Sequence, residues 1–273
     1  MNQNELEKEL YLIYKKFINK SNSVLENPSS LLNNTILDLI KELEKINPNS
    51  TKIKSLRKLV TTYISQLESF TFSNSINSID LIYKEVVKIT KKYINSNSNP
   101  KLNKFRKLIN DTIFTFKRSF DSLKDNALLF NNLTDKFLNN KLSETEKELF
   151  KNLTDKFKEK KFITITTKNG RERNYKVKTY IELVNRTSFA NAQVQSSIDT
   201  SEANNIFTFV VTSHNTQTEI CKPHENKIYT TLQKLTKYFP LLTNKNKPTY
   251  HVNCQHRLLP KPFTKKQLER MLK

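Results

Sequence analysis

Apolar residues recur every three or four positions through most of the first 160 residues, and this spacing places them on one face of an α-helix. The pattern predicts helices over about residues 5–18, 31–46, 52–70, 79–94 and 102–139. Ser143 and Glu146 then form a capping-box pattern that begins a further helix, which we expect to run through Phe157. Residues 1–160 are therefore predicted to form a helical region.

The pattern changes from helical to alternating after Lys161. Residues 162–167 alternate between apolar and polar side chains, which is typical of a half-buried strand, and residues 174–177 are predicted to return as its partner. Asn169-Gly170 lies between them and is the strongest short signal for a hairpin turn. It uses the single glycine of the chain. A β-hairpin is therefore expected at this point.

The rest of the chain holds fewer regular elements. Its pattern predicts a helix over about residues 179–203, a strand over 206–212 and a short basic helix over 264–273, with irregular chain from the strand to Pro262. The predicted fold class is therefore α+β and mainly α. A helical region at residues 1–160 is followed by a small α+β domain at residues 161–273, which contains the β-hairpin and a Cys/His-rich irregular knot.

The composition adds two expectations. With one glycine in 273 residues, turns that need a positive φ must rely on asparagine, which tolerates that conformation better than most residues. The formal net charge of +21 predicts attraction to polyanions, above all to nucleic acid. A second interpretation is that the lysines, which are spread along the chain, form ordinary solvated surface in a sequence biased toward Asn, Lys and Ile.

The sequence carries no signal for export or membrane insertion. No run of 18 or more apolar residues occurs, so no membrane-spanning helix is expected. The N-terminal residues lack the basic and apolar regions of a secretory signal. Two cysteines in a chain of this length argue against a disulfide framework and for a reducing compartment. We therefore expect a soluble protein that is made in a cytoplasm.

All four histidines and both cysteines lie between residues 214 and 256. Thiolate sulfur and imidazole nitrogen are the ligands that a tetrahedral zinc ion prefers. C-x-x-H and H-x-x-C each occur once here, and a separation of three positions lets two ligands reach one ion. The candidate ligands of a structural zinc are therefore Cys221, His224, His251 and Cys254, with His214 or His256 as alternatives. The other interpretation is that the cysteines are small buried residues and the histidines are polar structural partners.

Three segments of this region resemble, in their order, a known family. They are Thr212-Ser213-His214, residues 221–229 and residues 251–260, and we call them the closing motif. They resemble the end of phage minor capsid proteins of the Mu F-like head-morphogenesis group. In that group a Ser-His-like segment precedes C-x-x-C-x-P-x-x-G-K-x-[YF] and H-P-x-C-x-H-x-x-x-P. The residues singled out within the motif are Ser213, His214, Pro223, Glu225, Lys227, Arg257 and Pro260.

The resemblance extends upstream and covers about residues 160–262. Lys168-Asn169-Gly170-Arg171 is similar to the family's hairpin, and residues 180–187 are similar to its helix, where an Arg-Thr pair is typical. Three positions depart from the family pattern: Thr218 stands in place of the first cysteine, Asn226 in place of the glycine before Lys227, and Val252 in place of a proline. The missing cysteine weakens the case for zinc. Asn226 is expected to adopt the left-handed conformation.

The resemblance implies a minor capsid protein of a tailed bacteriophage, a head-morphogenesis protein held at the portal inside the head. Such a protein aids capsid assembly or the packaging and delivery of DNA. Its implied partners are the portal protein, other capsid proteins and packaged DNA, which it binds non-specifically, and no membrane. It would be made in the host cytoplasm and remain in the virion, inside the capsid. The helical residues 1–160 are the candidate attachment to the portal.

The resemblance implies no catalysis, and we assign no catalytic residue and no cofactor other than a structural zinc. The alternative is a metal-dependent nuclease, or another DNA-binding protein with a Cys/His site. A nuclease needs an open metal position with a general base beside it. Glu219 and Glu225 are the only carboxylates between His214 and His256, and Glu225 is expected to be a structural hydrogen-bond acceptor. A closed structural site is therefore the preferred prediction.

Overall fold

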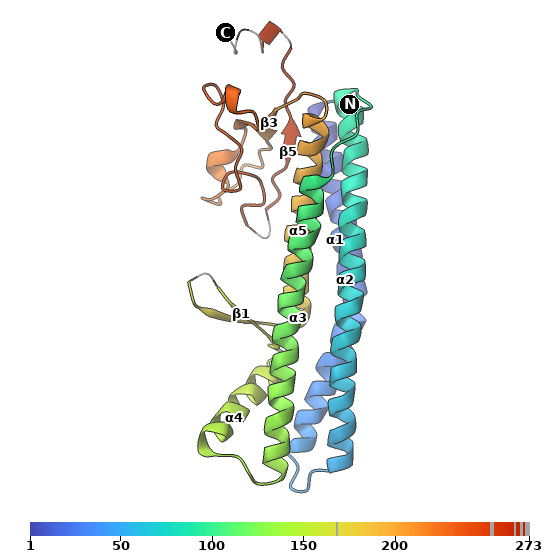
Figure 1. Ribbon diagram of the computed structural model, residues 1–273, viewed down its shortest axis with the longest axis vertical. Helices are drawn as coiled ribbons and strands as arrows, with labels where there is room; N and C mark the ends of the chain where they lie inside the picture. Colours follow the sequence, from blue (N-terminus) through green and yellow to red (C-terminus); the bar gives the residue numbers. More distant parts are fainter. Residues whose placement is uncertain (168, 252–253, 265, 268–269, 271–273) are drawn as a thin grey trace. The chain divides into compact units, whose positions relative to one another are not determined.

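The structure is a computed structural model that describes residues 1–167, 169–251, 254–264, 266–267 and 270 (Figure 1). Its α-helices are α1 (Gln3–Leu43), α2 (Ser50–Ile94), α3 (Asn103–Leu138), α4 (Glu144–Lys158) and α5 (Val177–Glu202). Its strands are β1 (Ile163–Thr166), β2 (Glu172–Tyr175), β3 (Thr208–Val211), β4 (Ile228–Thr230) and β5 (Leu258–Pro260), with two 3-10 turns, η1 (Lys222–His224) and η2 (Gln233–Leu235). The fold is α+β and mainly α, as the sequence predicts. No described helix combines the length and the apolar composition that crossing a membrane requires.

The first two helices are each longer than predicted. α1 continues through Asn27-Pro28, where the sequence predicts a break, and α2 continues through the polar residues 71–78. A proline removes one backbone donor from a helix, and next to it the buried Ser29 hydroxyl donates to the Leu25 carbonyl at 2.5 Å. Residues 71–78 contain neither glycine nor proline, so no local residue forces the helix to end there. The four helices predicted over residues 5–94 are therefore two.

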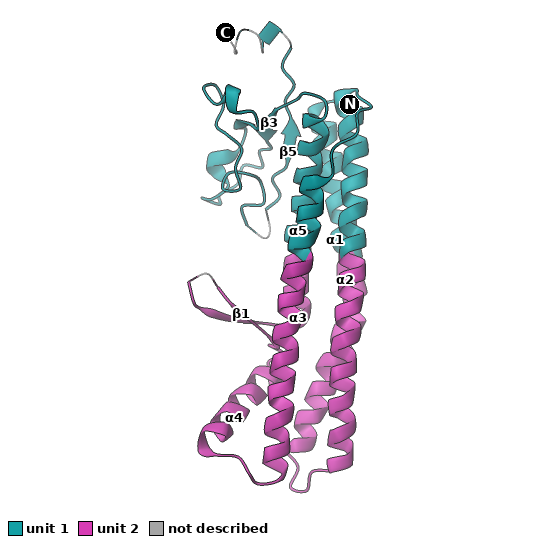
Figure 2. Cartoon of the chain, viewed as in Figure 1, with its two compact units in different colours: residues 1–20, 76–112, 185–273 teal, residues 21–75, 113–184 magenta. Residues whose placement is uncertain are grey.

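The chain forms two compact units, and each is built from segments that lie apart in the sequence (Figure 2). Unit 1 comprises Met1–Lys20, Ile76–Thr112 and Asn185–Lys273, and unit 2 comprises Ser21–Ser75 and Ile113–Val184. Both units thus contain residues from each side of residue 160, where the sequence predicts a division into a helical region and a small α+β domain. The compact units do not follow the predicted division at residue 160. That residues 1–160 attach to the portal and residues 161–273 form the minor capsid domain stays a prediction.

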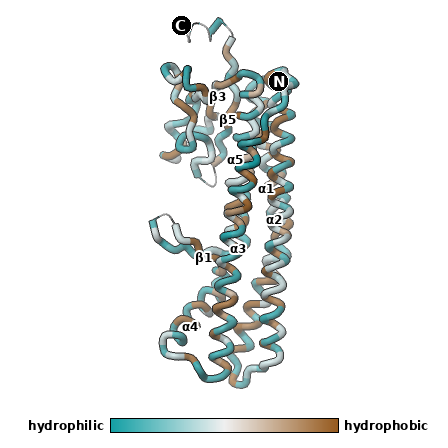
Figure 3. Tube along the Cα trace, in the orientation of Figure 1, coloured by the Kyte–Doolittle hydropathy of each residue, from teal (hydrophilic) through white to brown (hydrophobic). Residues whose placement is uncertain are grey.

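Unit 2 is a group of helices around one apolar core. Parts of α1, α2, α3 and α5 and residues of α4 line it, and apolar positions recur among polar ones along the helices (Figure 3). Its largest fully buried side chains are Phe116, Phe120, Phe130 and Phe162. The capping box is formed as predicted: the Glu146 N–H donates to Ser143 Oγ at 3.3 Å, and the Ser143 N–H donates to Glu146 Oε2 at 3.0 Å.

β1 and β2 pair in antiparallel fashion and form the predicted hairpin. Ile163 stands opposite Tyr175, and β2 begins two residues earlier than the sequence predicts. The Thr167 N–H donates to the Arg171 carbonyl at 2.8 Å, which closes the loop between the two strands. Lys168, the first residue of that loop, lies outside the described residues. The alternation of apolar and polar residues therefore identified β1, and the predicted partner strand overlaps β2 at residues 174 and 175.

Gly170 lies in the hairpin loop at a position that favours glycine. Its φ is +74°, a left-handed conformation, and a Cβ there would meet no atom within 4 Å. Gly170→Ala is therefore expected to lower the free energy of unfolding by about 1 kcal/mol, because the backbone conformation alone disfavours an L-residue. Gly170→Asn should lower it by less, since asparagine tolerates this conformation better. Urea denaturation of the wild type and the two variants measures their free energies of unfolding. Equal values for wild type and Gly170→Ala would refute the prediction.

Unit 1 combines helical segments with a three-stranded antiparallel sheet. Its strands occur in the order β4-β3-β5, so the buried β3 lies in the middle. Phe209 of β3 stands opposite Tyr229 on one side and Pro260 on the other. The sequence predicts β3 but treats the chain from there to residue 262 as irregular, and this is wrong for β4 and β5. Each has three residues, too few for alternation to be visible. The basic helix predicted over residues 264–273 falls largely outside the described residues.

Asparagine fills most of the left-handed backbone positions, as the near absence of glycine predicts. Among the described residues other than glycine, positive φ values occur at Asn95, Asn140, Asn205, Asn215 and Asn226, and also at Lys160 and Thr249. Asn95, Asn140 and Asn205 lie just after α2, α3 and α5. A left-handed residue there lets the following N–H groups turn back to the last carbonyls of the helix. The left-handed conformation predicted for Asn226 is confirmed.

Candidate metal centre

The closing motif surrounds the central strand of the unit 1 sheet. β3 ends at Val211, and the chain loops out and returns beside it, where the Asn226 N–H donates to the Val211 carbonyl at 2.9 Å. Cys221 lies on this loop, immediately before η1. Cys254 and His256 lie on the approach to β5, which pairs with β3. The sheet therefore brings the second and third segments of the closing motif together.

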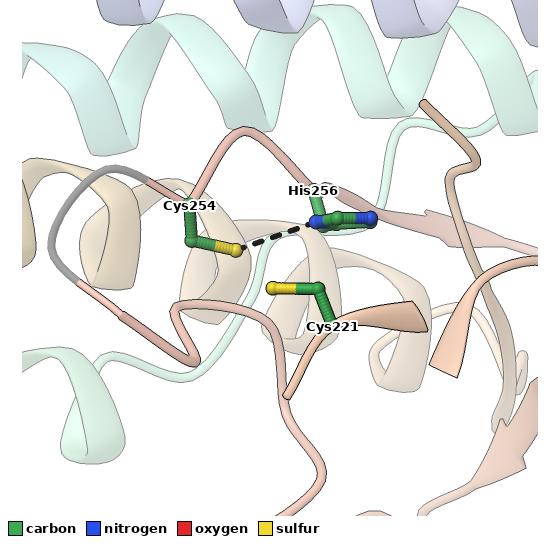
Figure 4. A group of neighbouring side chains, drawn as sticks. All are labelled: Cys221, Cys254 and His256. Atoms are coloured by element: carbon green, nitrogen blue, oxygen red, sulfur yellow. Dashed lines mark hydrogen bonds between the residues drawn. The ribbon is translucent and has the colours of Figure 1, made fainter. Parts of the chain in front are cut away.

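Cys221, Cys254 and His256 form a buried group (Figure 4). The two sulfurs and one ring nitrogen all lie within 4.8 Å of one another. The exposed fraction is 0% for Cys221, 4% for Cys254 and 3% for His256. Both cysteines are free thiols, and His256 Nδ1 lies 3.5 Å from Cys254 Sγ. Three good metal ligands thus converge almost out of contact with solvent.

Glu225 orients the imidazole of this group. Its Oε1 accepts hydrogen bonds from the backbone N–H of His214 at 2.8 Å and of Thr216 at 3.2 Å, and it lies 2.9 Å from His256 Nε2. A carboxylate in this position favours the tautomer with a proton on Nε2, which leaves the Nδ1 lone pair facing the sulfurs. A histidine that binds a metal commonly donates its other ring N–H to a carboxylate in this way. The arrangement is therefore that of a ligand with its supporting acceptor.

One separation in the group matches that expected around a tetrahedral zinc ion, and all three ligand atoms lie within 4.8 Å of one another. With Zn–S bonds of about 2.3 Å and Zn–N bonds of about 2.0–2.1 Å, a tetrahedral angle places sulfur and nitrogen about 3.5 Å apart. Cys254 Sγ and His256 Nδ1 are separated by 3.5 Å. Thiolate and imidazole are also donors that suit zinc better than they suit magnesium or calcium. The residues present thus fit three of the four positions of a zinc site.

The electrostatics of the two cysteines favour a cation between them. Burial and the neighbouring Cys254 sulfur raise the pKa of Cys221 to about 11. Burial opposes the ionisation of Cys254 as well, but in the metal-free group a protonated His256 ring donates to its sulfur through Nδ1, and this bond together with backbone hydrogen bonds at Thr249, Tyr250 and His256 lowers the pKa of Cys254 to about 7. The group by itself therefore ionises one sulfur readily and resists ionising the second. A divalent cation removes that resistance, because metal binding stabilises the thiolate form of each ligand.

A comparison with protein families matches residues 104–263 to the family described as phage minor capsid protein 2. The match spans more than half of the chain and includes the hairpin, α5 and the whole closing motif. The chain belongs to this family. Comparisons with curated proteins and with solved structures give no match. The resemblance to phage minor capsid proteins is thereby confirmed, and α4 and nearly all of α3 also lie within the matched residues.

The structure divides the candidate zinc ligands of this minor capsid protein into two sets. Cys221 and Cys254 come together as predicted, and His256, an alternative candidate, joins them. His224 and His251 do not belong to the group that the described residues form. The two cysteines that the sequence names as candidate ligands therefore meet, and the histidine that joins them is one that the sequence names only as an alternative.

His224 and His214 have partners of their own beside the group. His224 Nδ1 lies 2.5 Å from the Tyr229 hydroxyl oxygen, and its ring stacks on Tyr250 with centroids 4.4 Å apart. His214 Nε2 lies 3.1 Å from the Thr212 hydroxyl oxygen. Tyr229 is the aromatic residue that ends the second segment of the closing motif, whereas no motif marks Tyr250, and only their contacts show that both support a histidine. Both histidines therefore contribute to the packing around the three ligands.

The remaining motif residues lie on the backbone that carries the site. Ser213 is half-buried after β3, Pro223 is exposed in η1, Lys227 is exposed before β4, and Pro260 is buried at the end of β5. Pro223 fixes φ in the turn that follows Cys221. These residues therefore lie on the backbone that carries Cys221, Cys254 and His256.

The surroundings of Arg257, the last of the motif residues, could not be predicted from the sequence. Its side chain is 1% exposed, and its guanidinium lies 4.7 Å from the centroid of the Tyr14 ring. Its Nη1 donates to the carbonyls of Gln255 at 2.8 Å and of His256 at 3.1 Å. Arg257 thus links the backbone of a candidate ligand to α1. Tyr14 and Arg257 lie near opposite ends of the chain, so no spacing rule connects them.

Proposed function

We propose that this minor capsid protein is held at the portal inside the head of a tailed bacteriophage, where it aids capsid assembly or the packaging and delivery of DNA. The observation that carries the proposal is the family match, which runs through the whole closing motif. Its partners are then the portal protein, other capsid proteins and packaged DNA. A net charge of +21 supports the contact with DNA, because it attracts a polyanion without selecting its sequence.

The attachment to the portal is proposed to lie on α1 and α2. Both helices precede the residues that match the family. Such a position suits a segment that is specific to this protein and binds its own portal. Large apolar side chains that remain exposed on or between them are Leu12, Leu31, Ile46, Leu59 and Leu81. Ile46, in the connection between the two helices, is 99% exposed. Apolar side chains of this kind gain free energy when a protein partner covers them.

Zinc bound by Cys221, Cys254 and His256 is proposed to stabilise the closing motif and to take no part in catalysis. Support comes from the burial of all three side chains, because a catalytic metal needs a position open to substrate. Glu225, a carboxylate beside the group, already accepts hydrogen bonds from two backbone N–H groups and faces His256. It is therefore not free to act as a general base. These observations favour a structural site over a metal-dependent nuclease.

Quantitative mass spectrometry of purified particles tests this function. We expect the protein in mature virions and in proheads, at a copy number near that of the portal protein and far below that of the major shell protein. The reason is that a component held by one closed ring is limited by the number of sites on that ring. Proheads that have not packaged DNA are the control, because a protein that is held only by DNA would be missing from them. Absence from both kinds of particle, or a copy number close to that of the shell protein, would show the proposal to be wrong.

A further inference from the structure

We propose that the β1–β2 hairpin of unit 2 is a DNA-binding arm that holds the sugar-phosphate backbone of a duplex through Arg171, Arg173 and Lys176. This inference rests on the proposed contact with packaged DNA and gives that contact a location. The hairpin projects from the helices of unit 2 (Figure 1). Phosphates occupy the same positions in every sequence, so the arm binds without reading bases.

The segment that builds the hairpin is strongly basic. Residues 158–178 contain eight Lys and Arg residues and two acidic residues. Lysines at its base are paired with carboxylates: Lys158 lies 2.6 Å from Glu44, and Lys178 forms an ion pair with Glu26. These pairs neutralise Lys158 and Lys178, so the uncompensated charge lies at positions between them.

Arg171, Arg173 and Lys176 carry that uncompensated charge. All three are exposed, and in the part of the chain that the structure describes no carboxylate forms an ion pair with them. Arg171 and Arg173 stand two positions apart along the extended strand, so both side chains lie on one face of the ribbon. Glu172 lies on the opposite face, where it stands across from Thr166. One face of the hairpin therefore presents two guanidinium groups with no acidic neighbour between them.

The hairpin is fixed at its base by α3. Phe162 and Ile163 are buried in the core of unit 2. The Asn126 side chain donates to the Phe162 carbonyl at 2.9 Å, and the Ser122 hydroxyl donates to the Thr164 carbonyl at 2.9 Å. A ribbon that is already held in place loses little conformational freedom when it binds. The arginines are thus presented on a preformed support.

The chemistry of the tip favours nucleic acid over an acidic protein surface. Among the described residues from 150 to 219, no large apolar side chain is exposed. A protein interface usually has an apolar or aromatic centre, whereas phosphates are bound by Arg, Lys, Asn and Thr side chains. Asn169 and Thr166 are exposed on the hairpin that carries Arg171 and Arg173. A two-stranded ribbon also fits the major groove of B-DNA, which is about 12 Å wide.

Substitution of the two arginines in the full chain tests the inference. Arg171→Gln/Arg173→Gln is expected to weaken binding to a mixed-sequence duplex on the order of tenfold at physiological salt. It should also flatten the slope of log affinity against log salt by about 1.8, because each lost phosphate contact contributes about 0.9. The matched control is Lys54→Gln/Lys58→Gln, which removes the same charge from exposed positions of α2 in the same unit. It should leave the slope unchanged. Arg171→Lys/Arg173→Lys should retain most of the affinity, because lysine also contacts phosphates.

The outcomes separate this inference from the proposed function. If the wild-type protein binds no duplex from low to physiological salt, the DNA contact and the hairpin arm both fail. If the wild-type protein binds DNA but Arg171→Gln/Arg173→Gln and Lys54→Gln/Lys58→Gln weaken binding equally, only the inference about the hairpin is wrong. The same conclusion holds if neither variant weakens binding. Urea denaturation establishes that each variant is folded. If Arg171→Gln/Arg173→Gln binds DNA normally but is lost from proheads that contain no DNA, the partner of the hairpin is an acidic capsid protein, and the inference is overturned.

Discussion

Cys221→Ser is expected to remove the metal from the closing motif. Purified without chelator, the wild-type protein should carry about one equivalent of zinc, whereas Cys221→Ser and His256→Ala should retain less than about a tenth of an equivalent. The described group supplies three ligands, so each substitution leaves two. A site filled at a thousand times its dissociation constant contributes about 4 kcal/mol, and each kcal/mol shifts Tm by roughly 2–4 °C in a unit of this size. We therefore expect Tm to fall by roughly 10 °C. Elemental analysis and thermal unfolding measure the two effects.

His251→Ala is the matched control for this prediction. It removes a histidine three positions before Cys254, which the sequence predicts as a ligand and which the structure does not bring into the group. The variant should retain its zinc. Zinc loss in His251→Ala together with retention in His256→Ala would favour the spacing-based ligand set over the one in the structure. Less than about a tenth of an equivalent in the wild-type protein would rule out the zinc site itself.

Glu225→Ala is expected to destabilise unit 1 by roughly 1–3 kcal/mol, even in metal-free protein. Its Oε1 lies within hydrogen-bond distance of the His214 N–H, the Thr216 N–H and His256 Nε2. The His256 ring is buried, so leaving its Nε2 without this acceptor costs about 1–3 kcal/mol, whereas the exposed His214 N–H can donate to water instead. Glu225→Gln keeps one acceptor oxygen and should cost less. It should still weaken zinc binding by about 10–100-fold, because the carboxylate orients the histidine. Urea denaturation and competition with a chelator measure the two effects.

The stabilisation by Glu225 should also depend on pH. The hydrogen bond from the His214 backbone outweighs burial, and with help from His256 and Thr216 it lowers the pKa of Glu225 from 4.5 to about 2. A pKa that is lowered in the folded state stabilises the protein above the ordinary value, and the effect is lost as the pH falls through the folded value. In metal-free protein, the stability difference between wild type and Glu225→Gln should therefore narrow from about pH 4.5 toward pH 2. Glu219→Gln, an exposed position on the same loop, should show no such trend. A difference that stays constant over this range would be incompatible with the assigned role.

Features that depend on near neighbours were accessible from the sequence. Apolar spacing predicts helices over residues 102–139 and 179–203, and the structure has Asn103–Leu138 and Val177–Glu202. The Ser143 cap is predicted because it depends on residues within a few positions, and the left-handed Asn226 is predicted because it replaces the glycine of the family pattern. The three segments of the closing motif, taken in order, likewise indicate the family that the comparison confirms.

The choice of the nitrogen ligand needed the folded chain. The spacing of His251 and Cys254 shows that two side chains can reach one ion, but it does not fix the direction in which the chain turns. His256 lies two positions after Cys254, and the path of the folded chain brings its Nδ1 to 3.5 Å from Cys254 Sγ. The segment leads directly into β5, which pairs with β3, and the sequence does not reveal that pairing.

Contacts between distant parts of the chain were decided by tertiary structure alone. β4 and β5 are strands because they pair with β3, and three residues carry no periodic signal of their own. Arg257 is buried because α1 places Tyr14 against it from the other end of the sequence. α1 also passes through Pro28, since packing of its apolar face offsets the loss of one backbone hydrogen bond. The sequence by itself therefore determined the long periodic elements, the family and the supply of thiol and imidazole groups. The tertiary structure decided which of those groups meet, because that depends on residues far apart along the chain.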